Sequence, residues 1–409
     1  MSLRDFAGHE LAGPPAYGAR SVADVFESAA SLLAQQSLNP QPHPLWGAGR
    51  HDPLKLAELV EKAGYDASSY RSVCVIMVDG LGQHLLEQHA AYAPFLAKVP
   101  SLAVLDAALP STTAASLTSF GTALAPGTHA VAGYEVKNPD SGRIMNHLSG
   151  WDKSIDPRQW QPFSTVFERY EKCCDVATIS LSKYQGSGLS EAALRGGRFI
   201  HAQSLVARTT LASSILSARK PSLVYLYWGE IDQAGHRFGV DSPQWREHLE
   251  ELNLILRRFV HGLPSHVLVL LTADHGMVDI KPQDRIDYSG QQHLLDNVSL
   301  TAGEPRLVQL HLADRSEPAK AKLLQAWSQA YGDRAWILDS EQLYQQGYFG
   351  GHITEQARAR IGHIMVACRE DIALYDMRHY KEHALAMVGQ HGSWTDRERL
   401  VPLLLLPTG

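Results

Sequence analysis

The sequence predicts an α/β fold in which helices flank a doubly wound, mostly parallel sheet. Short apolar runs recur along the chain, and they are apolar on both faces, as strands buried inside a parallel sheet are. Helical patterns separate these runs, which gives the alternation of strand and helix that is typical of doubly wound folds. The predicted strands are Val73–Val78, Val176–Ile179, Leu223–Trp228 and Val267–Thr272. A change of texture over residues 286–383 indicates a small α+β cap inserted late in the main domain.

The chain begins with an extension, residues 1–50, that is rich in proline, glycine and alanine. It contains one predicted amphipathic helix, Ser21–Gln36, and then a linker broken by Pro40, Pro42 and Pro44. Further helical patterns cover Ala114–Ala123, Ser204–Ala218 and Pro243–Val260. In the last of these, the preceding serine caps the helix and the proline occupies its first turn.

The inserted cap has strands and a helix of its own. Its predicted elements are the strands Arg306–Leu312, Ala335–Leu338, His363–Cys368 and Ile372–Tyr375, and the helix Pro318–Tyr331. After it, Ala384–Val388 and Leu400–Leu406 return to the texture of core strands. We therefore divide the chain into an N-terminal extension (1–50), an α/β core (51–285 and 384–409) and the cap (286–383).

Composition and charge exclude several classes of protein. The chain has 409 residues, 44% of them apolar and 20% charged, so it can bury a large core and is not intrinsically disordered. Its net charge of −6 argues against a nucleic-acid partner, which requires a basic surface. No apolar run approaches the roughly 20 residues of a membrane span, and Met1–Gly18 carries no signal pattern. We expect a cytoplasmic protein without a membrane partner, and we leave its oligomeric state open.

Histidine is the unusual residue, because the chain has 20 His but only 4 Cys. Four cysteines in so long a chain, two of them adjacent (Cys173 and Cys174), do not indicate a disulfide scaffold. The ratio predicts that any metal site uses imidazole and carboxylate ligands rather than thiolates. Most of the histidines are nonetheless expected on the surface or in ordinary hydrogen bonds.

Ligand-type side chains follow the apolar strands, where ligand sites of open α/β sheets lie. These side chains are Asp79, Asp232, His236, Asp274, His275 and His391. Asp232 and His236 are four residues apart, so on a helix they lie on one face. Asp274 and His275 are adjacent, so they can reach different positions around one ion or two neighbouring ions. Taken singly, each segment also has a structural explanation, such as a helix cap, a turn or a hydrogen-bonded histidine.

A hydroxyl-rich segment, Pro110–Leu117, leads into a helical stretch. A hydroxyl there can cap the helix, which is its usual role. The same place favours a bound phosphate, and a metal-bound hydroxyl there could attack phosphorus. Together the segments supply three Asp, three His and a hydroxyl, which is enough for two divalent ions with open positions. This ligand mixture suits Zn²⁺, with Mn²⁺ and Fe as alternatives.

The order of these segments resembles the metal signature of the alkaline phosphatase superfamily, most of all its nucleotide pyrophosphatase/phosphodiesterase group. Pro110–Thr113 resembles the nucleophile segment of that group, and Asp232–Gly239 resembles its D-x-x-G-H-x-x-G pattern. Gly121–Pro126 with His129 resembles its T-G-x-x-P-x-x-H-G pattern. The resemblance covers about residues 72–280 and 385–395.

This resemblance implies an alkaline-phosphatase-like fold and a role for each residue. Thr113 would be the nucleophile, because the family places it three residues after the proline; Thr112 is the alternative. The implied ligand sets are Asp79, Asp274, His275 and Thr113 for one ion and Asp232, His236 and His391 for the other. The implied activity is hydrolysis of phosphodiester or pyrophosphate bonds in a small-molecule substrate, through a phospho-threonine intermediate.

The sequence departs from the family pattern near the nucleophile. Ala114–Ser116 stands where the family usually has an aromatic residue, proline and asparagine. Tyr134 takes the position of a phosphate-contacting asparagine, and its hydroxyl could donate a hydrogen bond instead. Tyr227 could be a stacking platform for substrate or a core aromatic.

Alternative functions remain at this stage. The same site could belong to a phosphomonoesterase, a sulfatase or a phosphonate hydrolase, or to a non-catalytic metal-binding relative. A metal-independent Ser-His-Asp hydrolase is disfavoured, because no G-x-S-x-G elbow is present. We expect substrate specificity to come from the cap and from the loop Lys137–Asp156.

Overall fold

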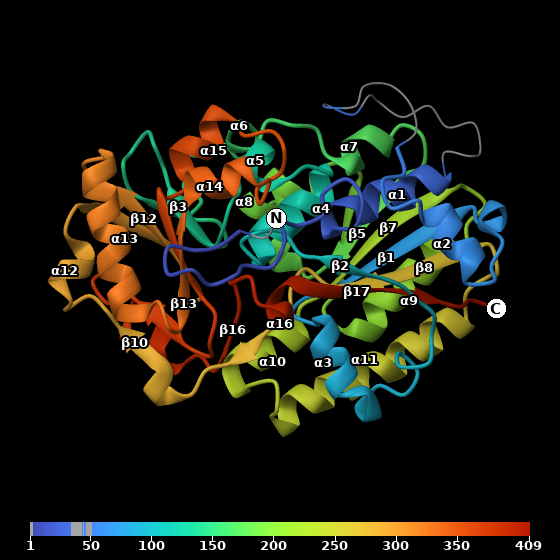
Figure 1. Cartoon of the computed structure of the whole chain (residues 1–409). Coiled ribbons are helices and arrows are strands. Elements are labelled where there is room, and N and C mark those ends of the chain that lie inside the picture. The colour runs from blue at the N-terminus through green and yellow to red at the C-terminus, as the bar shows by residue number, and fades with distance from the viewer. Residues whose placement is uncertain (1–2, 34–42, 44, 46–50) are drawn as a thin grey trace.

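The computed structural model describes residues 3–33, 43, 45 and 51–409, and it contains two large sheets (Figure 1). A seven-stranded sheet occupies one half of the molecule and a six-stranded sheet the other. The predicted linker prolines Pro40, Pro42 and Pro44 lie outside the described residues, as do positions 34–36 of the first predicted helix.

The seven-stranded sheet confirms the predicted fold class. In spatial order its strands are β2 (Ser101–Asp106), β17 (Leu400–Leu406), β8 (Val267–Thr272), β1 (Ser72–Val78), β7 (Ser222–Trp228), β5 (Asp175–Ser180) and β6 (Arg198–His201). The five strands from β8 to β6 are parallel, and β17 runs antiparallel to both of its neighbours. Every residue of β1, β7 and β8 is buried, as the continuous apolar runs predicted.

Helices cover both faces of this sheet. In Figure 1, α1 (Val25–Leu33) and α4 (Thr113–Thr122) lie above it, and α3 (Gln83–Gln88) and α11 (Pro243–His261) lie below. The other helices beside this sheet are α2 (Leu56–Lys62), α7 (Val166–Tyr170), α8 (Gly188–Ala193), α9 (Leu205–Leu216) and α10 (Glu230–Phe238). The predicted helices near 114–123, 204–218 and 243–260 are confirmed, including the cap in which Ser242 Oγ accepts from the Trp245 N–H at 3.1 Å.

The N-terminal region contributes to the core of the seven-stranded sheet. The first predicted helix appears as a short 3-10 turn, η1 (Val22–Asp24), followed by α1, and every residue of α1 is buried. The ring of Phe26 packs against Phe120, Phe167 and Tyr225, with centroid distances of 4.8, 4.5 and 6.3 Å. Burying one such aromatic side chain contributes about 1.5–3 kcal/mol, so α1 is an integral part of this half of the molecule.

The six-stranded sheet is antiparallel and comes mostly from the predicted cap. Its strands in spatial order are β13 (Ala335–Asp339), β14 (Ile364–Cys368), β12 (Leu307–Leu312), β11 (Val298–Glu304), β3 (Glu135–Lys137) and β4 (Ile144–Asn146). The helix α13 (Glu317–Tyr331) buries Trp327 in a separate hydrophobic cluster against this sheet. β4 comes from the loop Lys137–Asp156 that we expected to influence specificity, and β3 leads into that loop, so the sheet combines two distant parts of the chain.

One predicted strand is wrong. Residues 384–388 do not form a core strand; most of them belong to the 3-10 helix η7 (Glu382–Ala386). Ala384 and Leu385 instead pack against a small satellite cluster that includes Val278 and Tyr375. The apolar side chains of this stretch are therefore packed, but in a small cluster that lies outside the large sheets. The chain returns to the core through β16 (Gly389–Gln390), which pairs with β9 (Val278–Asp279).

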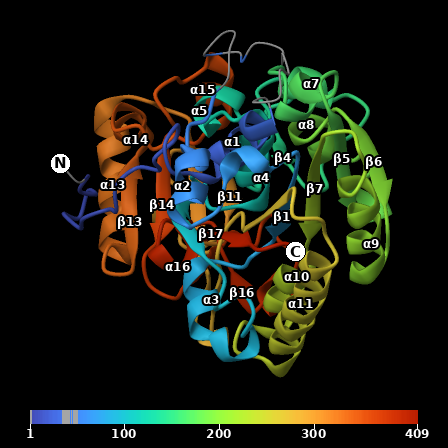
Figure 2. The same ribbon diagram turned by 90° about the vertical axis from the view of Figure 1, so that its right-hand side faces the viewer.

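The segment before α1 lies along the six-stranded sheet (Figure 2). The Phe6 N–H donates to the Ile337 carbonyl at 3.1 Å, and Trp336 Nε1 donates to the Glu10 carbonyl at 3.1 Å. The first residues thus touch one half of the molecule and α1 packs in the other. The division of the chain into an extension, a core and a cap stays a prediction.

The remaining elements are short. They are η3 (Ala67–Ser69), η4 (Ala90–Tyr92), α5 (Pro126–His129), α6 (Pro157–Trp160), η5 (Ser182–Tyr184), η6 (Pro282–Asp284), β10 (Arg285–Asp287), α12 (Gln292–Leu295), α14 (Ser340–Gln345), α15 (Glu355–Arg360), β15 (Ala373–Tyr375) and α16 (Asp396–Arg399). β15 pairs in parallel with β10 rather than with the large sheets.

Candidate functional site

The predicted ligand residues meet at one edge of the seven-stranded sheet. β1, β7 and β8 are adjacent and parallel, so their carboxyl ends lie together. Asp79 follows β1, Asp232 stands in the first turn of α10 after β7, and Asp274 and His275 follow β8. His391 reaches the same edge from the segment after β16. The fold thus brings together side chains that are hundreds of residues apart in the sequence.

One group of side chains surrounds His275. Its Nε2 atom lies 3.3 Å from Asp79 Oδ1 and 3.5 Å from Asp274 Oδ2. The Thr113 Oγ1 atom lies 3.1 Å from the same nitrogen. Asp79, Asp274 and His275 are all buried, whereas Thr113 is half-buried. A hydroxyl, two carboxylates and an imidazole therefore converge on one point.

A second group consists of Asp232, His236 and His391. The carboxylate and imidazole of the first two lie 3.4 Å apart, one turn of α10 from each other. The His391 ring lies 5.2 Å from the His236 ring and stacks on the His275 ring at 3.5 Å. Ligand atoms of these three residues lie close enough together to hold one metal ion, as do those of Asp79, Asp232 and His275. Asp232 belongs to both groups, which the sequence did not predict.

Each of the three histidines is oriented by a backbone carbonyl. His236 Nδ1 pairs with the Gly389 carbonyl at 2.7 Å. His275 Nδ1 pairs with the Gly276 carbonyl at 3.0 Å, and His391 Nδ1 pairs with the Ser111 carbonyl at 2.9 Å. A carbonyl only accepts, so Nδ1 carries the proton in each ring. The lone pair on Nε2 is then available for a metal ion, which is the arrangement typical of metal-binding histidines.

The carboxylates of this site lack hydrogen-bond partners on their inner oxygens. Within the described residues, Asp79 Oδ1, Asp232 Oδ1 and Asp274 Oδ2 are buried and accept no hydrogen bond. Burial, followed by the charges of Asp232 and Asp274, raises the pKa of Asp79 well above its ordinary value. Burial, followed by the charges of His275 and His236, lowers the pKa of His391 well below its ordinary value. Divalent cations would satisfy all of these groups at once, so the residues fit a pair of metal ions.

Gly80 makes the close approach of two carboxylates possible. It follows Asp79 with a φ of +73°, a conformation that side chains rarely adopt. A Cβ atom at this position would lie 3.2 Å from both the Cβ and the Oδ1 of Asp232. The glycine after Asp79 therefore leaves room for Asp232, which stands in the first turn of α10.

The two candidate nucleophiles differ in what their hydroxyls do. Thr112 caps α4, because its Oγ1 accepts from the Ala115 N–H at 3.4 Å. Thr113 is the first residue of α4, and its hydroxyl instead meets His275 in the first group of ligands. This contact favours Thr113, in agreement with its position in the motif. The N-terminus of α4 also presents N–H groups that favour a phosphoryl oxygen.

Tyr227 has a contact that the sequence did not predict. Its hydroxyl donates a hydrogen bond to Asp79 Oδ2, and its ring packs edge-on against Tyr184 at 5.5 Å. The side chain lies on the wall of the cavity described below but is only 8% exposed. The structure thus shows that Tyr227 donates a hydrogen bond to Asp79, while its role as a stacking platform stays a prediction.

A cavity of about 760 Å³, the main cavity, opens onto these residues. Thr113, Asp79, Asp232, His236 and His391 line one end of it. The residues that form the other walls are Tyr134, Glu135, Tyr184, Glu304, Tyr375, Tyr380 and Lys381, among others. Several of these come from the six-stranded sheet and the segment after β15. Apart from Tyr134, which the family motif had marked, no motif singled these residues out in the sequence.

His129, which stands in a matching motif, is structural. It is fully buried, its Nδ1 accepts from the Val131 N–H at 3.1 Å and its Nε2 pairs with Ser119 Oγ at 2.9 Å. Both ring nitrogens are therefore used to fix the chain after α5. Tyr134 lies on the cavity wall, as a substrate contact must, but its predicted role stays a prediction.

Comparisons with known proteins give a family. A family model described as type I phosphodiesterase / nucleotide pyrophosphatase matches residues 73–394. An uncharacterized pyrophosphatase/phosphodiesterase of Schizosaccharomyces pombe is 23% identical over 207 residues, which are 47% of this chain and 39% of that protein. Human ectonucleotide pyrophosphatase/phosphodiesterase family member 7 is 36% identical over 73 residues, 16% of each chain. The matched region spans less than half the length of these relatives.

Solved structures give the same fold. Murine ectonucleotide pyrophosphatase/phosphodiesterase 5, in complex with AMP, matches with a TM-score of 0.62 at 15% identity, over 81% of this chain and 87% of that one. Phosphonoacetate hydrolase from Sinorhizobium meliloti, in complex with phosphonoacetate, matches with a TM-score of 0.62 at 16% identity, over 83% and 91% of the two chains. These likenesses confirm the predicted α/β fold.

Proposed function

The chain belongs to the type I phosphodiesterase / nucleotide pyrophosphatase family of the alkaline phosphatase superfamily, and from this premise we propose that it is a metal-dependent hydrolase of phosphodiester or pyrophosphate bonds. Family membership confirms the resemblance predicted from the motifs. The observation that carries the proposal is the position of Thr113, whose hydroxyl lies 3.1 Å from His275 among the converging carboxylates and imidazoles.

We propose that the site holds two divalent metal ions. Asp79, Asp274, His275 and Thr113 would bind one, and Asp232, His236 and His391 the other, with Asp232 close to both. Zn²⁺ is the expected metal, because the ligands are a mixture of carboxylate and imidazole, with Mn²⁺ and Fe as alternatives. When bound, such ions lower the pKa of a nearby hydroxyl and neutralise the charge of a phosphoryl group.

The residues of the chain have separate tasks in the proposed reaction. Thr113 Oγ1 forms a bond to phosphorus while the bond from phosphorus to the leaving oxygen breaks, which gives a phospho-threonine. Water then cleaves the bond between Oγ1 and phosphorus and regenerates the threonine. The N–H groups at the start of α4 hold non-bridging oxygens, and Tyr134 is available to donate a further hydrogen bond. Tyr227 keeps Asp79 in place through its hydroxyl.

The proposal predicts that Thr113→Ala abolishes turnover of bis-p-nitrophenyl phosphate. Metal content, measured by mass spectrometry, should stay at the wild-type level, because six other ligands remain. Thr112→Ala is the matched control: it loses a helix cap, which costs about 1 kcal/mol of stability, but it should keep most of the activity. Full activity in the Thr113→Ala variant would overturn the assignment of the nucleophile.

The same assay separates the related functions. A phosphomonoesterase or a sulfatase would turn over the corresponding p-nitrophenyl monoesters faster than the diester. A phosphonate hydrolase would prefer a phosphonate, and a non-catalytic relative would bind metal without any turnover. Within the described residues, no helix has the length and apolar character of a membrane span. The absence of nucleic-acid and membrane partners and the cytoplasmic location stay predictions.

A further inference from the structure

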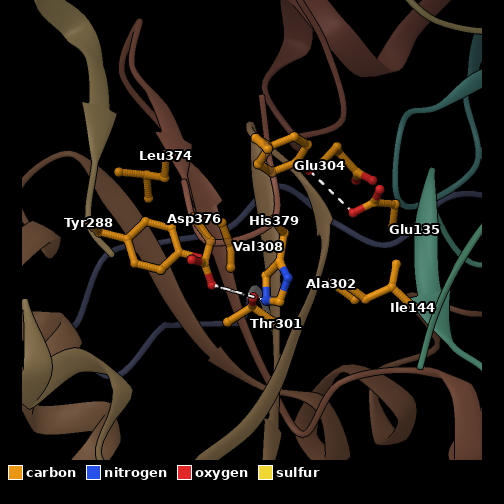
Figure 3. A pocket seen from close by; sticks show the side chains of 11 residues that line it. Glu135, Ile144, Tyr288, Thr301, Ala302, Glu304, Val308, Leu374, Asp376 and His379 are labelled. Atoms are coloured by element: carbon orange, nitrogen blue, oxygen red, sulfur yellow. Dashed lines mark hydrogen bonds and ion pairs between the residues drawn. The ribbon is translucent and has the colours of Figure 1, made fainter. Parts of the chain in front are cut away.

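A small pocket beside the main cavity, the side pocket, is lined by acidic, aromatic and aliphatic side chains (Figure 3). Its volume is about 10 Å³, which is room for about one water-sized group. Glu135, Glu304, His379 and Tyr380 line both the side pocket and the main cavity. The side pocket is therefore an extension of the space into which the Thr113 hydroxyl faces.

Glu304, at the end of β11, is the central side chain of this pocket. It is only 4% exposed, and its Oε2 accepts from the Tyr134 N–H at 3.1 Å. Its Oε1 is buried and has no hydrogen-bond partner within the described residues. A buried carboxylate oxygen without a donor is unfavourable, which indicates that a donor from outside the chain completes it.

The backbone makes room for this carboxylate. Gly392, next to the candidate ligand His391, has a φ of +129°, and a Cβ atom there would lie 2.4 Å from Glu304 Cγ. A side chain at this position would displace Glu304, so the glycine allows the carboxylate to reach the loop that carries His391. The Glu304 side chain thus reaches from the end of β11 to the glycine that follows the candidate ligand His391.

A second carboxylate, Glu135 from β3, faces the same pocket. Figure 3 shows the side chains of Glu135 and Glu304 running toward each other. Glu135 Oε2 accepts from the Tyr380 hydroxyl at 3.4 Å, and its Oε1 accepts from the Asn146 amide at 3.3 Å. The hydrogen bonds that these two carboxylates accept within the described residues therefore come from neutral donors. Burial, followed by the charge of Glu135, raises the pKa of Glu304 well above its ordinary value.

The other charges nearby do not neutralise this pair. The third carboxylate of the side pocket, Asp376, is already paired with Arg378 Nη2 at 2.6 Å and accepts from Thr301 Oγ1 at 2.6 Å. Lys381 lines the main cavity but not the side pocket, and it is exposed. Glu135 and Glu304 consequently face a space of atomic dimensions whose lining, among the described residues, includes no lysine or arginine. The histidine that lines it, His379, has its Nε2 atom 3.7 Å from Asp376 Oδ2.

We propose that the side pocket binds a protonated primary amine of the substrate, with the phosphoryl group held beside Thr113 and the amine donating to Glu304 Oε1 and Glu135. This inference rests on the proposed hydrolase function, because it places the amine on a phosphoester. A primary ammonium group has the N–H donors that the unpartnered oxygen lacks, and it is about the size of a water molecule. A trimethylammonium group has no N–H donor and is larger than a water molecule. The natural substrate class is therefore an aminoalkyl phosphoester.

Three p-nitrophenyl phosphodiesters test this proposal in the metal-loaded enzyme. They carry a 2-aminoethyl, an n-propyl or a 2-(trimethylammonio)ethyl group as the second ester. We expect kcat/KM for the aminoethyl ester to exceed that for the other two by roughly tenfold or more, the scale of one charge-assisted hydrogen bond. Equal values for the aminoethyl and propyl esters would overturn the proposal, as would a preference for the trimethylammonium ester.

Two variants show whether Glu304 is responsible. In Glu304→Gln the ratio of kcat/KM for the aminoethyl and propyl esters should fall to within about threefold, because the amide no longer attracts the ammonium group. The Gln side chain can still accept from the Tyr134 N–H, so the local fold is preserved. Glu382→Gln is the matched control, since Glu382 is an exposed carboxylate near the cavity that lines neither space. A Glu304→Gln variant with the wild-type ratio would exclude this residue.

A binding experiment separates this inference from the proposed function. Metal-loaded Thr113→Ala protein is titrated calorimetrically with 2-aminoethyl phosphate and with n-propyl phosphate. Binding of the amine that is about tenfold tighter supports the side pocket, even if no ester is ever turned over, in which case only the hydrolase function fails. Equal dissociation constants would overturn the side pocket, even if the enzyme hydrolyses diesters.

Discussion

The two ends of the main cavity both contain buried carboxylate oxygens without partners, but their surroundings differ. At the metal end, the oxygens of Asp79, Asp232 and Asp274 lie next to imidazoles whose Nδ1 atoms pair with backbone carbonyls and whose Nε2 atoms face the site. At the side-pocket end, Glu304 lies next to tyrosines and a second carboxylate. The first set of donors suits a divalent metal ion, and the second suits an organic cation with N–H groups.

The two ends also differ in the backbone that supports them. The metal end sits on the carboxyl ends of adjacent parallel strands, whose register is fixed by residues buried along their whole length. The side-pocket end is built from β3, β11 and the segment after β15, which come from distant parts of the chain. Under the two proposals, the chemistry belongs to the central sheet and the selectivity to strands and segments outside it.

The largest expected effect comes from removing the residue shared by both groups of metal ligands. Asp232→Asn should lower turnover by roughly a thousandfold or more, because a neutral amide cannot offset the charge of two ions. Metal content measured by mass spectrometry should fall at the same time. Asp241→Asn, which changes an exposed carboxylate just after α10, is the control. If Asp232→Asn retained two ions and most of its activity, Asp232 would not be a ligand shared by two metal ions.

A smaller effect is expected for the tyrosine that orients the first ligand. Tyr227→Phe removes the hydrogen bond to Asp79 Oδ2 and should weaken zinc binding by about tenfold, the usual scale for a residue that positions a metal ligand. Tyr225→Phe is the matched control, because Tyr225 lies on the same face of β7 and its hydroxyl has no partner within the described residues. Zinc affinity is measured by competition with a chelator. Equal losses in the two variants would mean that Tyr227 acts only by packing.

The smallest effect concerns the side-pocket end and depends on pH. Burial raises the pKa of Glu304, so the folded state holds the proton more tightly than the unfolded state. This tighter proton binding stabilises the folded state fully at pH values below the pKa that Glu304 has in the unfolded chain. The stabilisation is lost as pH rises through the pKa that Glu304 has in the folded protein. Glu304→Gln cannot ionise, so without substrate its Tm should exceed that of the wild type by about 2 °C or more at pH 8, and by less at pH 4.

Scanning calorimetry of the metal-loaded proteins at the two pH values measures this difference. Glu382→Gln should show no such pH-dependent gain, because that carboxylate is exposed. A Glu304→Gln variant that is less stable than the wild type at both pH values would show that Glu304 supports the fold. In that case the buried carboxylate of Glu304 would serve the fold, whereas those of the metal end would serve the binding of a cation.

The sequence predicted which side chains meet at the metal end, because Asp79, Asp232, Asp274 and His275 each follow a strand that is buried on both faces. Such strands read as continuous apolar runs, and parallel neighbours bring their carboxyl ends to one edge. The sequence did not show that Asp232 lies in both groups of ligands, because that depends on the close approach at Gly80. It also did not show the hydrogen bond from Tyr227, because a hydroxyl contact across two strands leaves no periodic pattern.

The side-pocket end was beyond prediction for a different reason. β3 and β4 have three residues each, which is too short for an alternating pattern to stand out. Their place beside β11 depends on a contact between residues that are far apart in the sequence. Residues 384–388 were predicted as a strand and form η7, because a short apolar run does not reveal which cluster it covers. Glu304 stands in no motif, so only the fold identifies it.

The place of β17 in the sheet has a consequence for biosynthesis. This strand is made after every other strand of its sheet, yet it lies between β2 and β8. While the chain is being translated, β8 therefore has an open edge and β2 has no neighbour in the sheet. His391 also lies only nine positions before Leu400, the first residue of β17, so the last candidate ligand and the last strand emerge from the ribosome close together. Closure of the sheet is thus a late event, and under the proposed function so is completion of the metal site, because a nascent chain truncated before residue 391 has neither β17 nor His391.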